Sequence, residues 1–178
     1  MDMLQPPTPY ALRPLQVADI TAVLEIERLS FPSVVRAALY KRELTDNDIA
    51  HYQGLWNNDE LIGYAGYWLI AGEAHISKIA VHPEWRRRRL GELMLLNLLR
   101  LACEQGAFLA TLEVRVSNIA AQQLYTKYRF EHVGRRRRYY HDTGEDALLM
   151  TAVFASDNYC QRLETWCQEL LVDLATAS

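Results

Sequence analysis

The hydrophobic positions of the chain recur with two periods, one of two residues, typical of strands, and one near 3.6, typical of helices. They predict the order β-α-α-β-β-β-α-β-α-β-β followed by a last helix. The expected strands span 10–15, 49–56, 61–70, 74–81, 112–116, 131–140 and 146–154, and the expected helices span 19–29, 34–44, 90–105, 118–128 and 157–174. Strands joined by helical crossovers predict the α/β class, a mixed sheet with helices on both faces.

The strand expected at 74–81 changes phase at Ser77-Lys78. Its apolar residues fall on even positions before this dipeptide and on odd positions after it. Such a shift is typical of a β-bulge, which bends a strand and leaves backbone groups for a ligand. A shift by chance, or a strand buried on both faces, explains the pattern equally well.

The last helix carries an apolar stripe formed by Tyr159, Leu163, Trp166, Leu170 and Leu174. A stripe of this kind needs a surface to cover it. We expect it to pack on the same domain, and a second copy of the chain in a homodimer is the alternative. Three prolines in the first nine residues predict a flexible leader at 1–9. The domain is therefore expected at 10–154, with a C-terminal helical extension at 155–178.

Composition places the chain among globular proteins, because 50% of its 178 residues are hydrophobic and 23% are charged. Its net charge of −3 conceals two runs of four arginines, Arg86–Arg89 and Arg135–Arg138, which hold eight of the 19 basic residues. The rest of the chain is acidic, which argues against a general nucleic-acid surface. Two local cationic spots indicate a small anionic ligand instead.

Several other classes of protein and site are not indicated. No apolar run reaches the length of a membrane span, and the N-terminus does not resemble a signal peptide, so we expect a cytoplasmic protein. The three scattered cysteines, Cys103, Cys160 and Cys167, are therefore expected to be reduced. The histidines and cysteines show no metal-ligand spacing, so no metal is expected. The glycine-rich loops of nucleotide-binding proteins are also absent.

The first arginine run lies between a strand and a buried helix. The unpaired N–H groups at the start of a helix, the helix dipole and the arginine charges together favour an anion. A solvated cationic turn is the alternative interpretation.

On its motifs, the chain resembles the GNAT acyl-CoA N-acyltransferases, and among them the RimI-type ribosomal-protein-alanine N-terminal acetyltransferases. The segments that carry this resemblance are Ile79-Ala80-Val81-His82-Pro83, Arg86-Arg87-Arg88-Arg89-Leu90-Gly91, Leu112-Glu113-Val114-Arg115-Val116-Ser117-Asn118-Ile119-Ala120-Ala121, Leu124-Tyr125 and Phe130. The resemblance covers residues 10–153 and implies the GNAT fold, whose mixed sheet is mostly antiparallel. It also implies acetyl-CoA as the donor and a peptide or protein N-terminus, such as that of a ribosomal protein, as the acceptor.

The resemblance assigns roles to individual residues. Glu113 is expected to act as the base, directly or through water, and Tyr125 as the acid for the departing thiolate. The residues expected to hold acetyl-CoA are Ile79, Ala80, Val81, Arg86, Arg87, Arg88, Arg89, Leu90, Gly91 and Asn118, and those expected to shape the peptide slot are Phe31, Tyr139 and Tyr140. The alternatives are a surface Glu113 paired with Arg115, a core tyrosine at 125, and ordinary cross-strand packing of the tyrosine pair.

Two positions depart from the family pattern. Arg89 and Arg129 stand where the family keeps glycine, which commonly serves left-handed backbone or close approach. Two other functions therefore stay open. One is acetylation of a small-molecule amine or a lysine side chain, and the other is a catalytically weak GNAT-like interaction module.

Overall fold

The computed structural model describes residues 3–32, 35–155 and 158–176. One seven-stranded sheet has the order β1-β2-β3-β4-β5-β7-β6. Its strands are β1 (Tyr10–Pro14), β2 (Ala50–Asn57), β3 (Glu60–Ile70), β4 (Glu73–Val81), β5 (Leu109–Arg115), β6 (Glu131–Tyr140) and β7 (Glu145–Val153). The β4–β5 pair is parallel, and the other neighbours are antiparallel. The predicted mixed, mostly antiparallel sheet is therefore confirmed.

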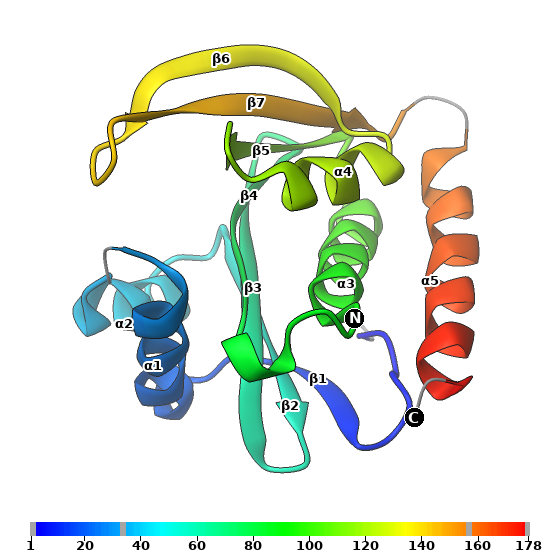
Figure 1. The fold of residues 1–178 in the computed structure, drawn as a ribbon. Coiled ribbons are helices and arrows are strands. Elements are labelled where there is room, and N and C mark those ends of the chain that lie inside the picture. Colours follow the sequence, from blue (N-terminus) through cyan, green and yellow to red (C-terminus); the bar gives the residue numbers. More distant parts are fainter. Residues whose placement is uncertain (1–2, 33–34, 156–157, 177–178) are drawn as a thin grey trace.

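Helices cover both faces of this sheet, as the hydrophobic pattern predicts (Figure 1). The helices are α1 (Ile20–Ser30), α2 (Ala37–Thr45), α3 (Leu90–Glu104), α4 (Ile119–Lys127) and α5 (Tyr159–Thr176), with short 3₁₀ turns η1 (Val17–Asp19) and η2 (Pro83–Trp85). Helices α1 and α2 lie on one face, and α3 lies on the other with α5 beside it. The two 3₁₀ turns were not predicted, and α2 begins later than expected, at Ala37.

The central helix α3 is buried along most of its length, in agreement with its nearly continuous run of leucines. It packs between the sheet and α5 in the larger of two hydrophobic clusters. Gly106, with φ +78°, follows the end of this helix, where a left-handed residue commonly terminates a helix.

The bulge expected in β4 is confirmed. Lys78 pairs with Gly66 and Ile76 with Tyr67, so Ser77 is the extra residue on β4. The parallel pairing of β4 with β5 is confined to three residue pairs, from Glu73–Leu109 to His75–Thr111. Beyond the bulge the two central strands therefore separate.

The C-terminal helix α5 packs on α3 of its own chain, which answers the question left by its apolar stripe. Leu163, Leu170 and Leu174 are buried as expected, but Trp166 is only partly buried and Cys167 is fully buried in its place. The stripe thus gives no argument for a homodimer.

The prediction that all cysteines are reduced is wrong for two of them. Cys103, near the end of α3, and Cys160, near the start of α5, form a disulfide with a Cα–Cα distance of 6.1 Å. Sequence spacing did not indicate the pair because 57 residues separate its members. Only the packing of α5 on α3 brings them together. Cys167 is a free, buried thiol.

The segment expected to be a flexible leader contacts the domain at Leu4, within the part that the structure describes. Leu4 is buried in the larger cluster, and its N–H donates to Asn97 Oδ1 at 2.8 Å. One apolar residue and one hydrogen bond thus fix the segment on α3 in spite of its prolines. Residues 1–2 lie outside the described part.

Candidate active site

A cavity of about 580 Å³ lies where β4 and β5 separate. It is lined by Phe31, Pro32, Ile76, Ser77, Lys78, Ile79, Leu112, Glu113, Val114, Arg115, Asn118, Tyr125, Tyr139, Tyr140, His141 and Asp142. Both predicted catalytic residues and all three predicted peptide-slot residues are among them. Of the ten expected acetyl-CoA residues, only Ile79 and Asn118 line this cavity, and the arginine loop lies outside its lining.

Glu113 projects from β5 into this cavity and pairs with an unexpected partner. Its Oε1 lies 3.2 Å from the Arg136 guanidinium of β6. Arg115, the alternative partner considered from the sequence, instead contacts Asp142 at 2.6 Å and Glu145 at 3.3 Å. The Glu113–Arg115 pairing is therefore wrong, and the Glu113 carboxylate stays at the cavity wall.

Tyr125 lies on α4, and its ring contacts Phe130 with centroids 5.7 Å apart. Burial, and to a smaller extent the nearby Tyr140, raise the pKa of Tyr125 to about 12. The phenol therefore stays protonated at neutral pH, and it can donate a proton or a hydrogen bond into the cavity.

Lys78, in the lining of the cavity, belongs to a buried polar cluster that the sequence patterns did not indicate. Glu27 of α1 is 0% exposed and accepts hydrogen bonds from Lys78 Nζ and from the hydroxyls of Tyr40 and Tyr64. Burial alone would raise the pKa of Glu27, but these hydrogen bonds outweigh it and lower the pKa. The feature of the sequence that could have indicated this cluster is Glu27, a glutamate on the apolar face of the first helix. The cluster fixes Lys78 at the bulge, 4.8 Å above the Phe31 ring.

The arginine loop connects β4 to α3, and its side chains point in different directions. Arg86 donates to the Val81 carbonyl and to Ser30 Oγ, each at 3.0 Å. Arg88 lies over the Trp85 ring at 4.7 Å. Arg87 is exposed and has φ +60°. The loop thus presents Arg87, Arg88 and the first-turn N–H groups of α3 for an anion.

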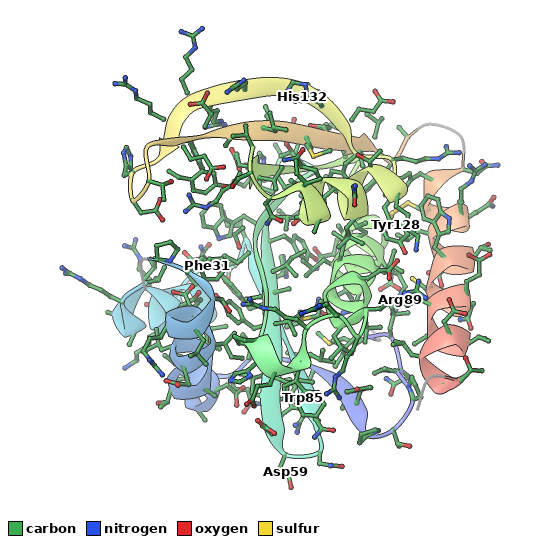
Figure 2. The ribbon with its side chains drawn as sticks, in the orientation of Figure 1. Phe31, Asp59, Trp85, Arg89, Tyr128 and His132 are labelled. Atoms are coloured by element: carbon green, nitrogen blue, oxygen red, sulfur yellow. A yellow bond between two sulfur atoms is a disulfide. The ribbon has the colours of Figure 1, made fainter. Side chains whose placement is uncertain are left out.

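Arg89 turns away from this anion site. It has φ +59°, a left-handed conformation that costs a non-glycine residue about 1–2 kcal/mol. Its guanidinium contacts Glu92 at 2.6 Å and Asp173 of α5 at 2.5 Å. Figure 2 shows it between α3 and α5. The arginine therefore adopts the glycine conformation, and its side chain does not crowd the loop.

Comparison with known proteins agrees with this geometry. Residues 20–130 match the Acetyltransferase (GNAT) family. The chain belongs to the GNAT acetyltransferase family. It is 41% identical over 143 residues to a Bacillus subtilis protein named "Putative ribosomal protein bS18-alanine N-acetyltransferase", covering 80% of this chain and 95% of that protein.

Two further comparisons concern Escherichia coli. The ribosomal protein bS18-alanine N-acetyltransferase of that organism is 36% identical over 98 residues, which cover 54% of this chain and 66% of the relative. The crystal structure of the E. coli ribosomal-protein-S18-alanine N-acetyltransferase superposes with a TM-score of 0.76 at 27% identity, covering 83% of this chain and 96% of that one. The protein is thus an acetyl-CoA-dependent N-acetyltransferase.

In this GNAT enzyme the helix α4 is capped at both ends. The Asn118 side chain accepts from the N–H of Ala121 at 3.2 Å and so caps the start of the helix that was expected at 118–128. At the other end, Arg129 has φ +62°, and the N–H of Phe130 donates to the Tyr125 carbonyl. This is the Schellman arrangement, with arginine at the position usually held by glycine.

The tyrosine pair, Tyr139 and Tyr140, lines the cavity from the end of β6. Tyr139 and Tyr140 contact each other edge to face at 5.2 Å, and Arg115 lies 3.9 Å from the centroid of the Tyr140 ring. The register of β6 shifts between Arg136 and Tyr140, and this irregularity places the pair at the end of the hairpin. In the second arginine run, Arg135 pairs with Asp146 at 2.7 Å.

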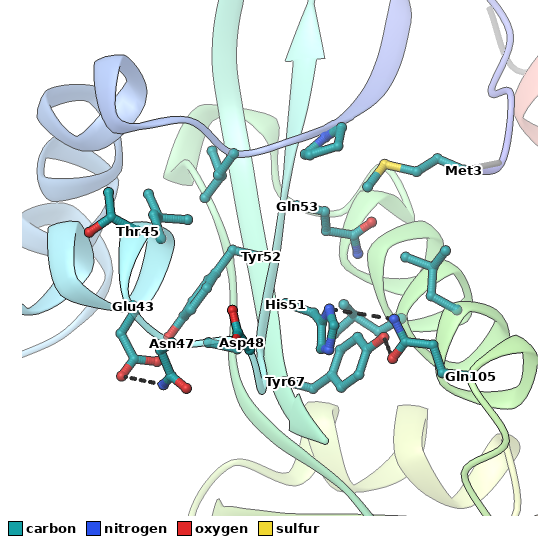
Figure 3. A pocket seen from close by; sticks show the side chains of 16 residues that line it. Met3, Glu43, Thr45, Asn47, Asp48, His51, Tyr52, Gln53, Tyr67 and Gln105 are labelled. Carbon is teal, nitrogen blue, oxygen red and sulfur yellow. Dashed lines mark hydrogen bonds between the residues drawn. The ribbon is translucent and has the colours of Figure 1, made fainter. Parts of the chain in front are cut away.

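A second cavity, of about 320 Å³, lies between α2 and α3 at the edge of β2 (Figure 3). Its polar side chains bond to one another: Tyr67 donates to Gln105 at 2.8 Å, and Asn47 donates to Glu43 at 3.2 Å. None of the predicted site residues lines it. It shares no lining residue with the cavity that contains Glu113 and Tyr125.

Two observations concern other kinds of site. Within residues 3–32, 35–155 and 158–176, no group of three or more His, Cys, Asp or Glu side chains could hold a metal ion. Over the same residues, no helix has the length and apolar character needed to cross a membrane.

Proposed function

We propose that this enzyme acetylates the N-terminal α-amine of a protein, specifically a ribosomal protein that begins with alanine, in the cytoplasm. The names of the B. subtilis and E. coli relatives support this acceptor. The observation that carries the proposal is the cavity in which Glu113 and Tyr125 face the tyrosine pair and Phe31. Its volume, about 580 Å³, lies within the usual range of ligand sites.

The chemistry begins at the acceptor amine. A peptide α-amine has a pKa of about 7.7–8.0, so it is largely protonated at neutral pH and must lose a proton before attack. Glu113 is the carboxylate on the cavity wall that accepts this proton, directly or through a water molecule. The free amine nitrogen then attacks the thioester carbonyl carbon.

The attack places negative charge on the carbonyl oxygen and then on sulfur. Along Ile79–Val81, after the bulge, successive N–H groups of β4 point alternately toward β3 and away from it. Those that point away from β3 can bind the oxygen where β5 no longer pairs. The carbon–sulfur bond then breaks, and the CoA thiolate takes a proton from Tyr125. Its raised pKa keeps Tyr125 protonated until that step. The nitrogen releases the second proton of the attacking amine as the amide forms, and a proton from solvent restores the Tyr125 phenol.

Donor binding is assigned to the arginine loop. The CoA pyrophosphate would lie on the N–H groups from Arg87 to Gly91, with the charges of Arg87 and Arg88 beside it. The Arg86 side chain holds the loop to β4 and α1, and Leu90 anchors it as a buried residue of α3. Asn118 faces the cavity from the start of α4.

Two other functions are less well supported. A small-molecule amine or a lysine would suit a closed slot, but Tyr139 is 40% exposed at the rim of an open cavity. A weak interaction module was suggested by Arg89 and Arg129. Both adopt the backbone conformation that glycine would supply, so neither distorts the loop or the helix end.

Mass spectrometry of acetyl transfer tests the proposal. A peptide beginning with alanine should gain one acetyl group at its α-amine. The same peptide with a blocked N-terminus and a free lysine should gain none. Transfer to the blocked peptide, or to small amines but to no α-amine in a panel of N-terminal sequences, would overturn the proposed acceptor.

A further inference from the structure

Helix α5 is attached to both ends of α3. The two helices are antiparallel, because Cys160 near the start of α5 joins Cys103 near the end of α3, and Asp173 near the end of α5 contacts Arg89 at the start of α3. The contact between Arg89 and Asp173 ties a C-terminal extension directly to the loop assigned to the CoA pyrophosphate. Figure 1 shows α5 beside α3, and Figure 2 shows Arg89 between the two helices.

Arg89 is held by two carboxylates. Its Nε donates to Glu92 Oε2 at 2.6 Å, and its Nη1 donates to Asp173 Oδ2 at 2.5 Å. Glu92 is nearly buried and also accepts from Lys127 and Tyr128, so it is a fixed point in the structure. Asp173 supplies the other fixed point from α5.

These contacts define one end of the arginine loop. Arg86 fixes the other end through the Val81 carbonyl and Ser30. Between the two ends, Arg87 and Arg89 both have left-handed backbone, which arginine does not favour. A backbone of this kind persists when side-chain contacts hold it, and a loop held in its binding geometry loses less entropy on binding.

We propose that Asp173 is a positioning residue for acetyl-CoA. Acting through Arg89, it holds the pyrophosphate loop in the geometry that binds the donor, so α5 forms part of the donor site. This inference rests on the proposed placement of the pyrophosphate. Asp173 is 58% exposed on its side chain, and exposed ion pairs are weak, so its effect is modest and sensitive to salt.

Steady-state kinetics of Asp173→Asn test the proposal. The KM for acetyl-CoA should rise roughly two- to fivefold at low salt, with kcat and the KM for the peptide unchanged. S-acetylpantetheine, which has the thioester but no pyrophosphate, should show no difference between variant and parent. Glu169→Gln is the matched control, since it removes a carboxylate from an exposed position of the same helix.

A double variant tests the route through Arg89. In an Arg89→Gly background, Asp173→Asn should have no further effect on the KM for acetyl-CoA, because the partner is gone. An equal effect in both backgrounds would overturn the proposal, as would an equal effect on S-acetylpantetheine. A lower KM in Asp173→Asn would also overturn it, since that would mean that Asp173 withholds Arg89 from the phosphates.

Arg88→Ala distinguishes the positioning role of Asp173 from the placement of the pyrophosphate on the arginine loop. If it raises the KM for acetyl-CoA while Asp173→Asn does not, the positioning role of α5 fails and the donor site stands. If neither variant changes the KM, the placement of the pyrophosphate on this loop fails as well.

Discussion

The guanidinium of Arg136, on the edge strand β6, reaches across β7 to Glu113 on β5, with 3.2 Å between Nη2 and Oε1. The proposed base is therefore a paired carboxylate at the cavity wall. The pair is solvent-accessible on the Arg136 side, whose side chain is 55% exposed. A pair of this kind contributes little to stability, so its two members can be changed separately without unfolding the protein.

Glu113→Gln should lower kcat about a hundredfold or more, because an amide cannot accept the proton of the amine. The melting temperature should change little. Arg136→Ala removes the partner but keeps the carboxylate, so its loss of kcat should be much smaller. Equal losses in the two variants would show that the ion pair, and not proton transfer, is what the reaction needs.

Tyr125→Phe should lower kcat about tenfold or more, because the thiolate then leaves without a proton donor. The pKa of Tyr125, raised to about 12, keeps the phenol protonated well above neutral pH. The ratio of parent to variant kcat should therefore stay constant between pH 7 and pH 10, measured with saturating substrates. A ratio that falls steadily toward one over that range would mean that Tyr125 ionises there, which contradicts the proposed acid.

Sequence patterns predicted the parts of this site that depend on local geometry. The phase shift at Ser77-Lys78 located the bulge, in which Ser77 is the extra residue. The strand expected at 112–116 buries Leu112 and Val114 and leaves Glu113 on the other face. The resemblance to a family indicated the roles of Glu113 and Tyr125, which the cavity brings together.

Contacts between distant segments could not be predicted in this way. Arg89 and Asp173 are 84 residues apart, and Lys78 and Glu27 are 51 apart. No period or spacing in the sequence connects such residues. They meet because α5 packs on α3 and α1 packs on β4, and both arrangements depend on the whole core.

Glu92 should make the stability of the protein depend on pH in the acid range. Burial alone would raise the pKa of Glu92, but hydrogen bonds from Arg89, Lys127 and Tyr128 outweigh it and lower the pKa from 4.5 to about 2. The ionised carboxylate thus stabilises the fold above about pH 4.5. That contribution is lost as the pH falls toward 2.

Glu92→Gln tests this assignment. At pH 7 it should lower the free energy of unfolding by about 2 kcal/mol, through loss of charge-assisted hydrogen bonds. The difference from the parent should shrink as the pH falls from 4.5 to 2, measured by urea unfolding. Glu169→Gln, which changes an exposed carboxylate, should follow the parent at every pH. A Glu92→Gln difference that is independent of pH would contradict the assigned ionisation.

The Cys103–Cys160 disulfide should stabilise the folded chain, because it closes a long loop that the unfolded chain would otherwise leave open. A dithiol reductant should lower the free energy of unfolding by roughly 2–4 kcal/mol, with a matching fall in melting temperature. Cys103→Ser should be destabilised to a similar degree without reductant and should not respond to it. This second comparison is the control, since it shows that the reductant acts through this bond and not through Cys167. If the parent protein melts at the same temperature with and without reductant, the two sulfurs are not bonded in solution, and packing alone holds α5 on α3.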